Sequence, residues 1–367
     1  MNKLWTNEEN QILINNYQTM QLKDIVKRYL SNRTYFAAKT QKLRLKITKR
    51  QYTSVDENYF NEINVKNCQI AGFVSADGCI STNDRFIIKL SCKDIDYLKK
   101  IKEIIKHNGQ MYINKVIRNG KIGKTNVNFT GTYCSIYTWK TKKWSEDLKK
   151  HWNIVPRKTL ILEPPNLTKL EHILSFLSGS LDGDGMITFS KNPEYKIPFC
   201  LHLQFMGTEK LMVWIKENFD KLTPTNKKAK VYKSKYANVH YYLVTGIRAY
   251  IIIKMMLSLD ILRLDRKWNL AREYIGLIEN NNNLSVEMLC KLNRMITPEI
   301  RQFIENNGGK IPDFRTLYWN KRVEINHGKL PEKIEKQKNL QINLSFSPFS
   351  PIISCNDNLE KEQKTLY

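Results

Sequence analysis

Apolar residues along this chain recur with two different periods, and the order of those periods predicts a repeated arrangement of secondary structure. A period of two predicts strands with one buried face at 86–92 and 197–205. A period of about 3.6 predicts an amphipathic helix over 94–107. The remaining elements of the first half are expected as strands over 111–117 and 127–134 and a helix over 136–152. Those of the second half are expected as a helix over 208–219, strands over 230–235 and 238–244, and a helix over 248–259.

A short apolar segment rich in small residues precedes each of these runs. Residues 70–78 read IAGFVSADG and residues 177–185 read LSGSLDGDG, so that Asp184 follows Asp77 by 107 positions. Such an internal repeat predicts two half-domains of the same build. Each copy carries small residues four positions apart, on one face of a helix, which lets two helix backbones approach closely. These small residues are Gly72, Ala76, Gly179 and Gly183.

The acids at the ends of these helices suggest a cation site. Asp77 and Asp184 fall in the last turn, where the helix dipole is negative and does not favour an anion. Two carboxylates brought together there require a positive partner, and hard oxygen ligands suit Mg²⁺ better than zinc. Gly78 and Gly185 are expected to leave the helices in the left-handed conformation. The alternative is two unrelated Asp-Gly turns, which the matched spacing of the two copies disfavours.

Both segments resemble the signature helices of the LAGLIDADG homing endonucleases, in the single-chain form that carries two copies. The resemblance covers about 67–275 and implies an α+β fold of two pseudo-symmetric αββαββα half-domains, packed through their signature helices. It also implies a monomer that cuts double-stranded DNA with Mg²⁺ or Mn²⁺ and leaves short 3′ overhangs. Asp77 and Asp184 would then be catalytic metal ligands, with further ligands from the backbone carbonyls near Ala76 and Gly183.

Two lysines close the two halves in matching places. Arg157-Lys158 and Arg266-Lys267 resemble the family's basic tail, so Lys158 and Lys267 are candidates for stabilising the charge on the phosphate or for tuning the attacking water. The alternative is a surface lysine at the start of a helix. One departure concerns the sixth position of the motif, which is Asp182 in the second copy and Ser75 in the first.

In this family the free faces of the two sheets form a saddle on the major groove of DNA. The residues implied as DNA contacts are Arg85, Lys89 and Ser91 in the first half and Lys196, His202 and Gln204 in the second. The alternative for each of them is an ordinary solvated sheet face. The recognition sequence does not follow from the chain, because it depends on side-chain geometry and on the deformability of the DNA.

Residues 1–50 have the features of a separate basic module. Thr6 and Glu9 have the spacing of a capping box, and eleven Lys and Arg stand against three acids. The Trp-Thr-x-Glu-Glu start followed by three short helices resembles Myb/SANT-like helix-turn-helix domains. That likeness places the third helix in the major groove, with Lys39, Lys42 and Arg44 as DNA contacts. A small helical cap with a solvated basic face is the alternative.

The expected domain organisation joins these observations. It consists of a helix-turn-helix module over 1–50, a linker over 51–66, half-domains over 67–165 and 166–278, a helical extension over 279–330 and a mobile tail over 331–367. The extension is interpreted either as an accessory DNA contact or as a helical pad on the second half, and the sequence leaves both open.

Composition narrows the class of function. Sixty Lys and Arg against 35 Asp and Glu give a net charge of +25, which is typical of proteins that bind polyanions. The seven cysteines form no Cys-x-x-Cys pair and indicate reduced thiols in an intracellular protein, without distinguishing cytoplasm, nucleus or organelle. The six histidines lack metal-ligand spacing, which disfavours a His-based zinc nuclease. No membrane span or secretory signal is present, so no membrane partner is expected.

The resemblance, together with the composition, therefore implies a site-specific DNA endonuclease with double-stranded DNA as its partner. Two alternatives remain open. One is a maturase that binds intron RNA and assists splicing on the same fold. The other is a DNA-binding regulator that does not cleave.

Overall fold

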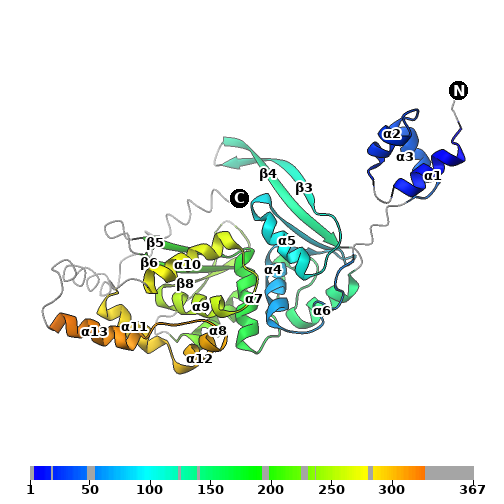
Figure 1. Cartoon of the computed structure of the whole chain (residues 1–367). Helices are drawn as coiled ribbons and strands as arrows, with labels where there is room; N and C mark the ends of the chain where they lie inside the picture. The colour runs from blue at the N-terminus through cyan, green and yellow to red at the C-terminus, as the bar shows by residue number, and fades with distance from the viewer. Residues whose placement is uncertain are drawn as a thin grey trace. The chain divides into compact units, whose positions relative to one another are not determined.

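The computed structural model describes residues 4–17, 20–47, 54–122, 125–138, 141–191, 198–224, 230–235, 237–279 and 284–326. The chain divides into two compact units (Figure 1). The first contains residues 1–55 and 107–109, and the second contains 56–106 and 110–367. No helix in these described ranges is both long and apolar enough to span a lipid bilayer.

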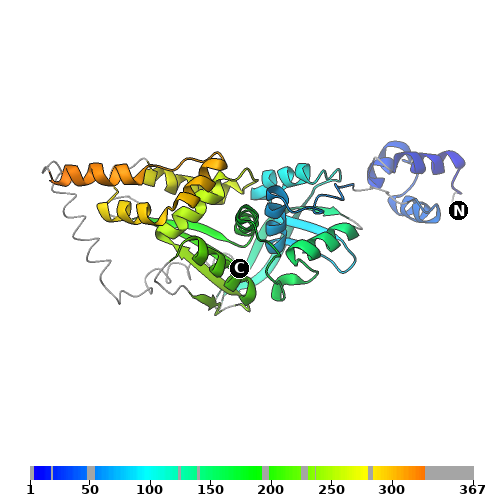
Figure 2. The ribbon, with the colours of Figure 1, turned by 90° about the horizontal axis from the view of Figure 1, so that it is seen from below.

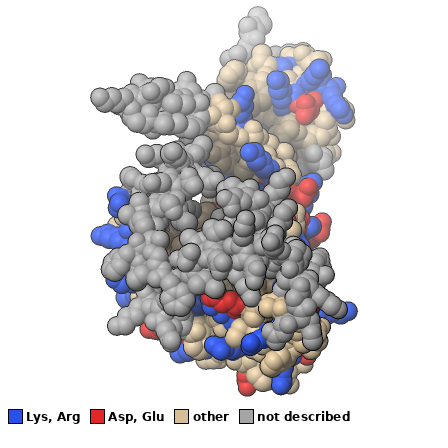
Figure 3. All heavy atoms as spheres, turned by 90° about the vertical axis from the view of Figure 1, so that its left-hand side faces the viewer, with Lys and Arg blue, Asp and Glu red and all other residues tan. Residues whose placement is uncertain are grey.

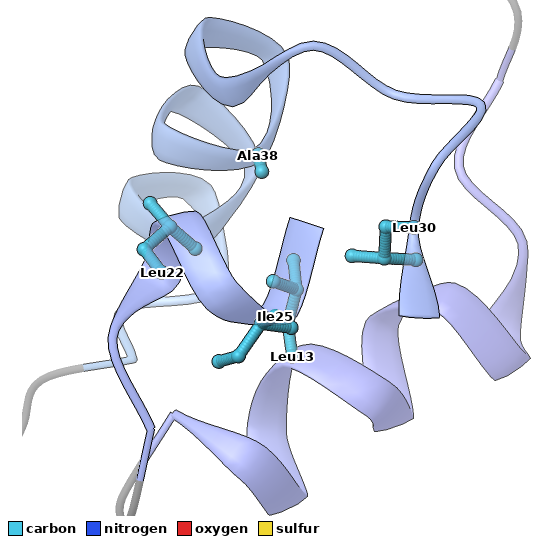
Figure 4. Packing of buried hydrophobic residues seen from close by; sticks show 5 residues of the cluster. All are labelled: Leu13, Leu22, Ile25, Leu30 and Ala38. Atoms are coloured by element: carbon cyan, nitrogen blue, oxygen red, sulfur yellow. The ribbon is translucent and has the colours of Figure 1, made fainter. Parts of the chain in front are cut away.

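The first unit is a small helical module. Its helices are α1 (Asn7–Asn16), α2 (Leu22–Tyr29) and α3 (Tyr35–Arg44). Their apolar faces meet in a core of Leu13, Leu22, Ile25, Leu30 and Ala38 (Figure 4).

The expected capping box at the start of α1 is present. The Glu9 N–H donates to Thr6 Oγ1, and the Thr6 N–H donates back to the Glu9 carboxylate. The same carboxylate forms a buried ion pair with Arg33 at 2.6 Å. Glu9 therefore both caps its own helix and fixes the turn between α2 and α3, which orients the third helix.

The second unit contains the element order α-β-β-α-β-β-α twice. The first set is α4 (Val65–Ala76), β1 (Gly78–Ile80), β2 (Phe86–Ser91), α5 (Ile95–Ile104), β3 (Tyr112–Ile122), β4 (Thr125–Thr138) and α6 (Lys142–Trp152). The second set is α7 (Leu170–Asp182), β5 (Met186–Lys191), β6 (Pro198–Gly207), α8 (Glu209–Leu222), β7 (Val231–Lys233), β8 (His240–Thr245) and α9 (Gly246–Ser258). The two sets form two four-stranded antiparallel sheets with matching strand orders, β1-β2-β4-β3 and β5-β6-β8-β7. Helices α4 and α7 pack side by side between them (Figures 1 and 2).

Alternation in sequence correctly predicted which face of each central strand is buried. Alternate residues of β2, and of β6 from Leu201 to Phe205, lie in a core, and the residues between them lie on the other face of the sheet. The buried residues are Phe86, Ile88 and Leu90 in β2 and Leu201, Leu203 and Phe205 in β6.

Expectations for two parts of the first sheet were wrong. Residues 136–138 belong to β4 rather than to the following helix, because Ile136 is buried opposite Ile88 and Thr138 pairs with Phe86. The sheet ladder therefore continues to Thr138, and α6 begins only at Lys142. The β3–β4 hairpin is also longer than its apolar pattern indicates, since backbone pairing continues from Ile117 to Ile122.

Gly78 and Gly185 do not adopt the left-handed conformation that was expected of them, because neither has a positive φ angle. Their role is steric. A Cβ on Gly78 would lie 2.7 Å from the Val74 Cα, and one on Gly185 would lie 2.5 Å from the Leu181 Cα. The chain turns back so tightly against its own helix that a side chain does not fit.

Four further helices follow the second sheet. They are α10 (Asp265–Glu279), α11 (Val286–Met295), α12 (Pro298–Asn306) and α13 (Phe314–Asn326). Helix α10 packs on β5 and β6, α12 packs on α9, and α13 packs on α11. Residues 331–367, expected from the sequence to be a tail, lie outside the described residues.

Candidate catalytic site at the helix seam

Helices α4 and α7 approach so closely that only glycine fits at their crossing, which we call the helix seam. A Cβ on Gly72 would lie 1.9 Å from the Phe176 carbonyl oxygen, and a Cβ on Gly179 would lie 1.9 Å from the Gln69 carbonyl oxygen. The two contacts are equivalent in the repeat. Gln69 and Phe176 are 107 positions apart, as Gly72 and Gly179 are. The contact is reciprocal, as an approximate two-fold axis requires.

The close approach continues to the ends of the helices, where the acids lie. A Cβ on Gly183 would lie 2.4 Å from the Ala76 Cβ and 3.5 Å from the Asp77 Cγ. Asp77 is the C-cap residue of α4, and Asp184 follows the end of α7 by two residues. The small residues of the repeat therefore bring the two acidic ends together, as their spacing predicted.

The electrostatics of Asp77 reflect this arrangement. Enclosure by the surrounding protein raises the pKa of Asp77 to about 6, and the nearby charge of Asp184 acts in the same direction. Lys267, Lys158 and Arg266 oppose the shift, with smaller effects. Two neighbouring carboxylates that repel each other form a site that a divalent cation stabilises.

The two candidate lysines bind the ends of the two seam helices. The Lys158 Nζ donates to the Gly78 carbonyl oxygen at 2.6 Å and to that of Ala76 at 3.5 Å. The Lys267 Nζ donates to the carbonyl oxygens of Leu181, Gly183 and Gly185 at 2.7, 2.5 and 2.6 Å. An ammonium group at the negative end of a helix satisfies carbonyls that have no partner within the helix.

Burial lowers the pKa of both candidate lysines. The pKa of Lys158 is below its usual value, and that of Lys267 is lowered to about 8. Nearby carboxylates oppose the shift in each case, Asp184 first for Lys158 and Asp182 first for Lys267. The two lysines therefore occupy corresponding positions in the two halves, beside the acids.

The oxygen atoms at the seam fit a hard divalent cation. Across the described residues, no cluster of three or more His, Cys, Asp or Glu side chains is arranged for a metal. The available ligands are the carboxylates of Asp77 and Asp184 and the carbonyls of Ala76 and Gly183. Both carbonyls accept a hydrogen bond from a lysine, and each oxygen retains a second lone pair. Mg²⁺ is typically held by one or two carboxylates, with water and substrate phosphates completing its shell.

Asp182 lies at the same seam, but its role did not follow from the sequence. It is buried and accepts four hydrogen bonds, from Gln69, Tyr97, Leu264 and Trp268. Burial raises its pKa to about 6. Ser75, the corresponding residue of the first copy, donates instead to the Gly72 carbonyl of its own helix. The difference between the two copies at this motif position was the only sequence signal for it.

The predicted DNA contacts of the first sheet lie on its free face, and two of them are held by tyrosines. The Arg85 guanidinium lies 4.7 Å from the ring centroid of Tyr137, and the Lys89 ammonium lies 4.7 Å from that of Tyr133. Such cation–π contacts orient a charge while leaving it able to meet a phosphate or a base. Ser91, the third predicted contact, accepts a backbone hydrogen bond from Lys93.

Two of the three predicted contacts of the second sheet lie within the described residues. His202 is half-buried, with its pKa lowered by burial, and Gln204 is only 4% exposed. Lys196 lies outside the described residues. On the same face Tyr232 and Tyr241 stack at 5.3 Å between ring centroids. Sequence reasoning overlooked the tyrosines of both sheets, although the alternation through Tyr133, Ser135 and Tyr137 placed the first set on the free face.

In the first unit the predicted contacts of α3 fall into two groups. Lys39 and Arg44 are exposed. The Lys42 Nζ donates to the Tyr17 hydroxyl at 3.0 Å, so this lysine supports the packing of α3 on α1. Two large apolar side chains on α3 also face solvent, Phe36 at 74% and Leu43 at 65% exposure.

No family model matches this chain, and no curated protein matches it. Solved structures do resemble it. The I-LtrWI LAGLIDADG homing endonuclease bound to target DNA matches with 13% identity over 67% of this chain and 97% of that one, with a TM-score of 0.37. The LAGLIDADG meganuclease I-AabMI bound to uncleaved DNA matches with 16% identity over 64% and 98%, with a TM-score of 0.37. The homing endonuclease I-GzeII in complex with its DNA target matches with 13% identity over 69% and 100%, with a TM-score of 0.36.

Proposed function

We propose that this chain is a site-specific endonuclease of the LAGLIDADG homing type, which makes a metal-dependent double-strand break in DNA. The observation that carries the proposal is the helix seam. Glycines that admit no side chain bring the ends of α4 and α7 together, with a carboxylate at each end, the buried Lys158 at the first and the half-buried Lys267 at the second. One acid and one lysine for each half provide one reaction centre for each DNA strand.

The acid and the lysine of each centre have different roles. Asp77 and Asp184 would hold Mg²⁺ or Mn²⁺, with carbonyl oxygens near Ala76 and Gly183 as further ligands. When bound, such an ion orients and activates water for in-line attack on the phosphate and stabilises the leaving 3′ oxygen. Lys158 and Lys267 place a positive charge beside the phosphate, where negative charge increases in the transition state.

The free faces of the sheets would hold the DNA. Arg85 and Lys89, oriented by tyrosines, supply charged contacts in the first half, and His202 supplies a polar one in the second. The net charge of +25 favours a polyanionic partner. On the face drawn in Figure 3, Lys and Arg side chains lie at several places around the described surface, with Asp and Glu side chains among them. Lys39 and Arg44 on α3 would add a second contact through the helix-turn-helix module.

The test is cleavage of a randomised double-stranded DNA library by the full chain in Mg²⁺, with Ca²⁺ in place of Mg²⁺ as the control. A single recovered target, cut on both strands with short 3′ overhangs only in Mg²⁺, is the expected result. Selection of a target that is bound but never cut would indicate a DNA-binding regulator instead.

A maturase is the second candidate, and α13 is the observation that favours it. Trp319 on this helix is 56% exposed, and the neighbouring Arg322 donates to the Tyr318 hydroxyl at 3.0 Å. Aromatic rings and guanidinium groups stack on unpaired RNA bases. Stimulated splicing of an intron RNA without nicking of any DNA would decide for this alternative.

A further inference from the structure

Asp182 is a buried carboxylate whose two oxygens serve different half-domains. Its Oδ1 accepts from the Leu264 N–H at 3.0 Å and from the Trp268 Nε1–H at 2.6 Å, both in the second half. Its Oδ2 accepts from the Tyr97 hydroxyl at 2.8 Å and from the Gln69 Nε2 at 3.2 Å, both in the first. Four donors compensate a buried charge that would otherwise be costly, and they make this side chain a bridge across the helix seam.

The second-half partners of Asp182 lie on either side of Lys267 in sequence. Leu264 immediately precedes α10, and Trp268 belongs to the first turn of that helix. Hydrogen bonds to both residues fix this turn, and the turn carries Lys267. The Lys267 Nζ can then reach the three carbonyl oxygens at the end of α7.

A second link across the seam involves the residue beside Lys267. The Arg266 guanidinium binds the Asp94 carboxylate in a bidentate manner, at 2.8 and 3.1 Å, and Asp94 is buried. Asp94 is the N-cap residue of α5, the first-half helix that also carries Tyr97. Helix α5 is therefore linked to the start of α10 twice, directly through Arg266 and indirectly through Asp182 of α7.

The other lysine is held in a different way. The residues that correspond in the repeat to Gln69 and Tyr97 are Phe176 and Leu211, the latter being the third residue of α8 as Tyr97 is of α5. Neither side chain can donate a hydrogen bond, so an acid in place of Ser75 would lack such donors. Lys158 instead begins a single 3-10 turn, Lys158–Leu160.

We infer that Asp182 is a positioning residue that couples the Lys267 centre, and not the Lys158 centre, to the packing of the two half-domains. This inference rests on the proposed endonuclease function and deepens it. One strand of the target would be cut by a centre whose lysine is placed through groups from both halves. The other strand would be cut by a centre that does not need this bridge.

The test measures the two strand cuts separately in single-turnover reactions, on a target labelled on one strand or the other. Asp182→Asn keeps the shape of the side chain but replaces one accepting oxygen with an N–H₂ group. That group faces hydrogen-bond donors and cannot accept from them. Its expected effect is a loss of about 10- to 100-fold in the rate constant for one strand, with the other unchanged and singly nicked DNA accumulating. Tyr97→Phe removes one hydroxyl and keeps the ring packed on Phe73, so a smaller loss on the same strand is expected.

Ser75→Ala, at the corresponding position of the first copy, is the matched control and should change neither strand. Affinity for the target in Ca²⁺ and the melting temperature report whether a variant is folded and binds. Should Asp182→Asn fail to fold, Tyr97→Phe alone decides. Equal slowing of both strands by the folded variants, or no slowing, overturns the inference while leaving the endonuclease in place. A wild-type chain that cuts neither strand of a target it binds overturns both.

Discussion

At the scale of single residues, Asp77 and Asp184 decide whether the seam can hold a metal. Replacing either acid with Asn keeps its size and removes its charge, so the metal loses an anionic ligand. We expect Asp77→Asn or Asp184→Asn to slow double-strand cleavage by about 1000-fold or more, while binding in Ca²⁺ is retained. Gel-shift and cleavage assays on the selected target check this prediction. Glu146→Gln, an exposed acid of α6, is the control, and full cleavage by either seam variant would refute the assignment.

Lys89 carries a second residue-level prediction, because its ammonium group is held over Tyr133 on the free face of the first sheet. Lys89→Ala should weaken binding by about 1–3 kcal/mol, or relax the preference at one base pair, depending on whether it contacts a phosphate or a base. The base profile of targets recovered from the library distinguishes the two outcomes. Lys150→Ala, which changes an exposed lysine of α6, is the control. Helix α6 packs on the opposite, core face of the same sheet, through the contact of Trp144 with Phe86. Equal affinities and profiles for the two variants would exclude Lys89 as a DNA contact.

At the scale of elements, the pairing of α4 with α7 depends on the absence of side chains. A methyl group on Gly179 would lie 1.9 Å from the Gln69 carbonyl oxygen, and neither backbone can move without separating the two helices. Gly179→Ala should therefore destabilise the chain by about 3 kcal/mol or more, although alanine favours helices. Urea unfolding measures this loss. Ser178→Ala, the neighbouring residue on α7, loses only a hydroxyl bonded within its own helix and should cost no more than about 1 kcal/mol. A Gly179→Ala chain as stable as wild type would contradict the tight crossing.

At the scale of the whole molecule, the positive charge predicts how binding responds to salt. The logarithm of affinity should fall linearly with the logarithm of salt concentration, with a slope that counts the neutralised phosphates. If α3 contacts DNA as proposed, Lys39→Ala combined with Arg44→Ala should reduce the magnitude of that slope by about 2. Titrations at several salt concentrations measure it. Lys23→Ala with Lys27→Ala, two exposed lysines of α2, is the matched control. The same slope for wild type and the α3 variant would leave the first unit without a phosphate contact through these residues.

The sequence by itself determined those features that depend on local pattern and on the repeat. Alternation placed Phe86, Ile88 and Leu90 in the core, because a strand turns successive side chains to opposite faces. The matched glycines predicted that two helices approach closely, because small residues on one face of a helix allow another backbone to pack against it. The capping box of Thr6 and Glu9 was readable for a similar reason, since it joins residues three positions apart.

Only the tertiary structure decided the features that join residues far apart in the chain. Asp182 became a bridge because Gln69, Tyr97, Leu264 and Trp268 converge on it, and no local pattern indicates that four donors meet at one carboxylate. The end of β4 was likewise set by its partner strand, and the role of Gly78 by the turn of the chain against Val74. Each of these outcomes depends on the packing of one element against another, and that packing exists only once the chain has folded.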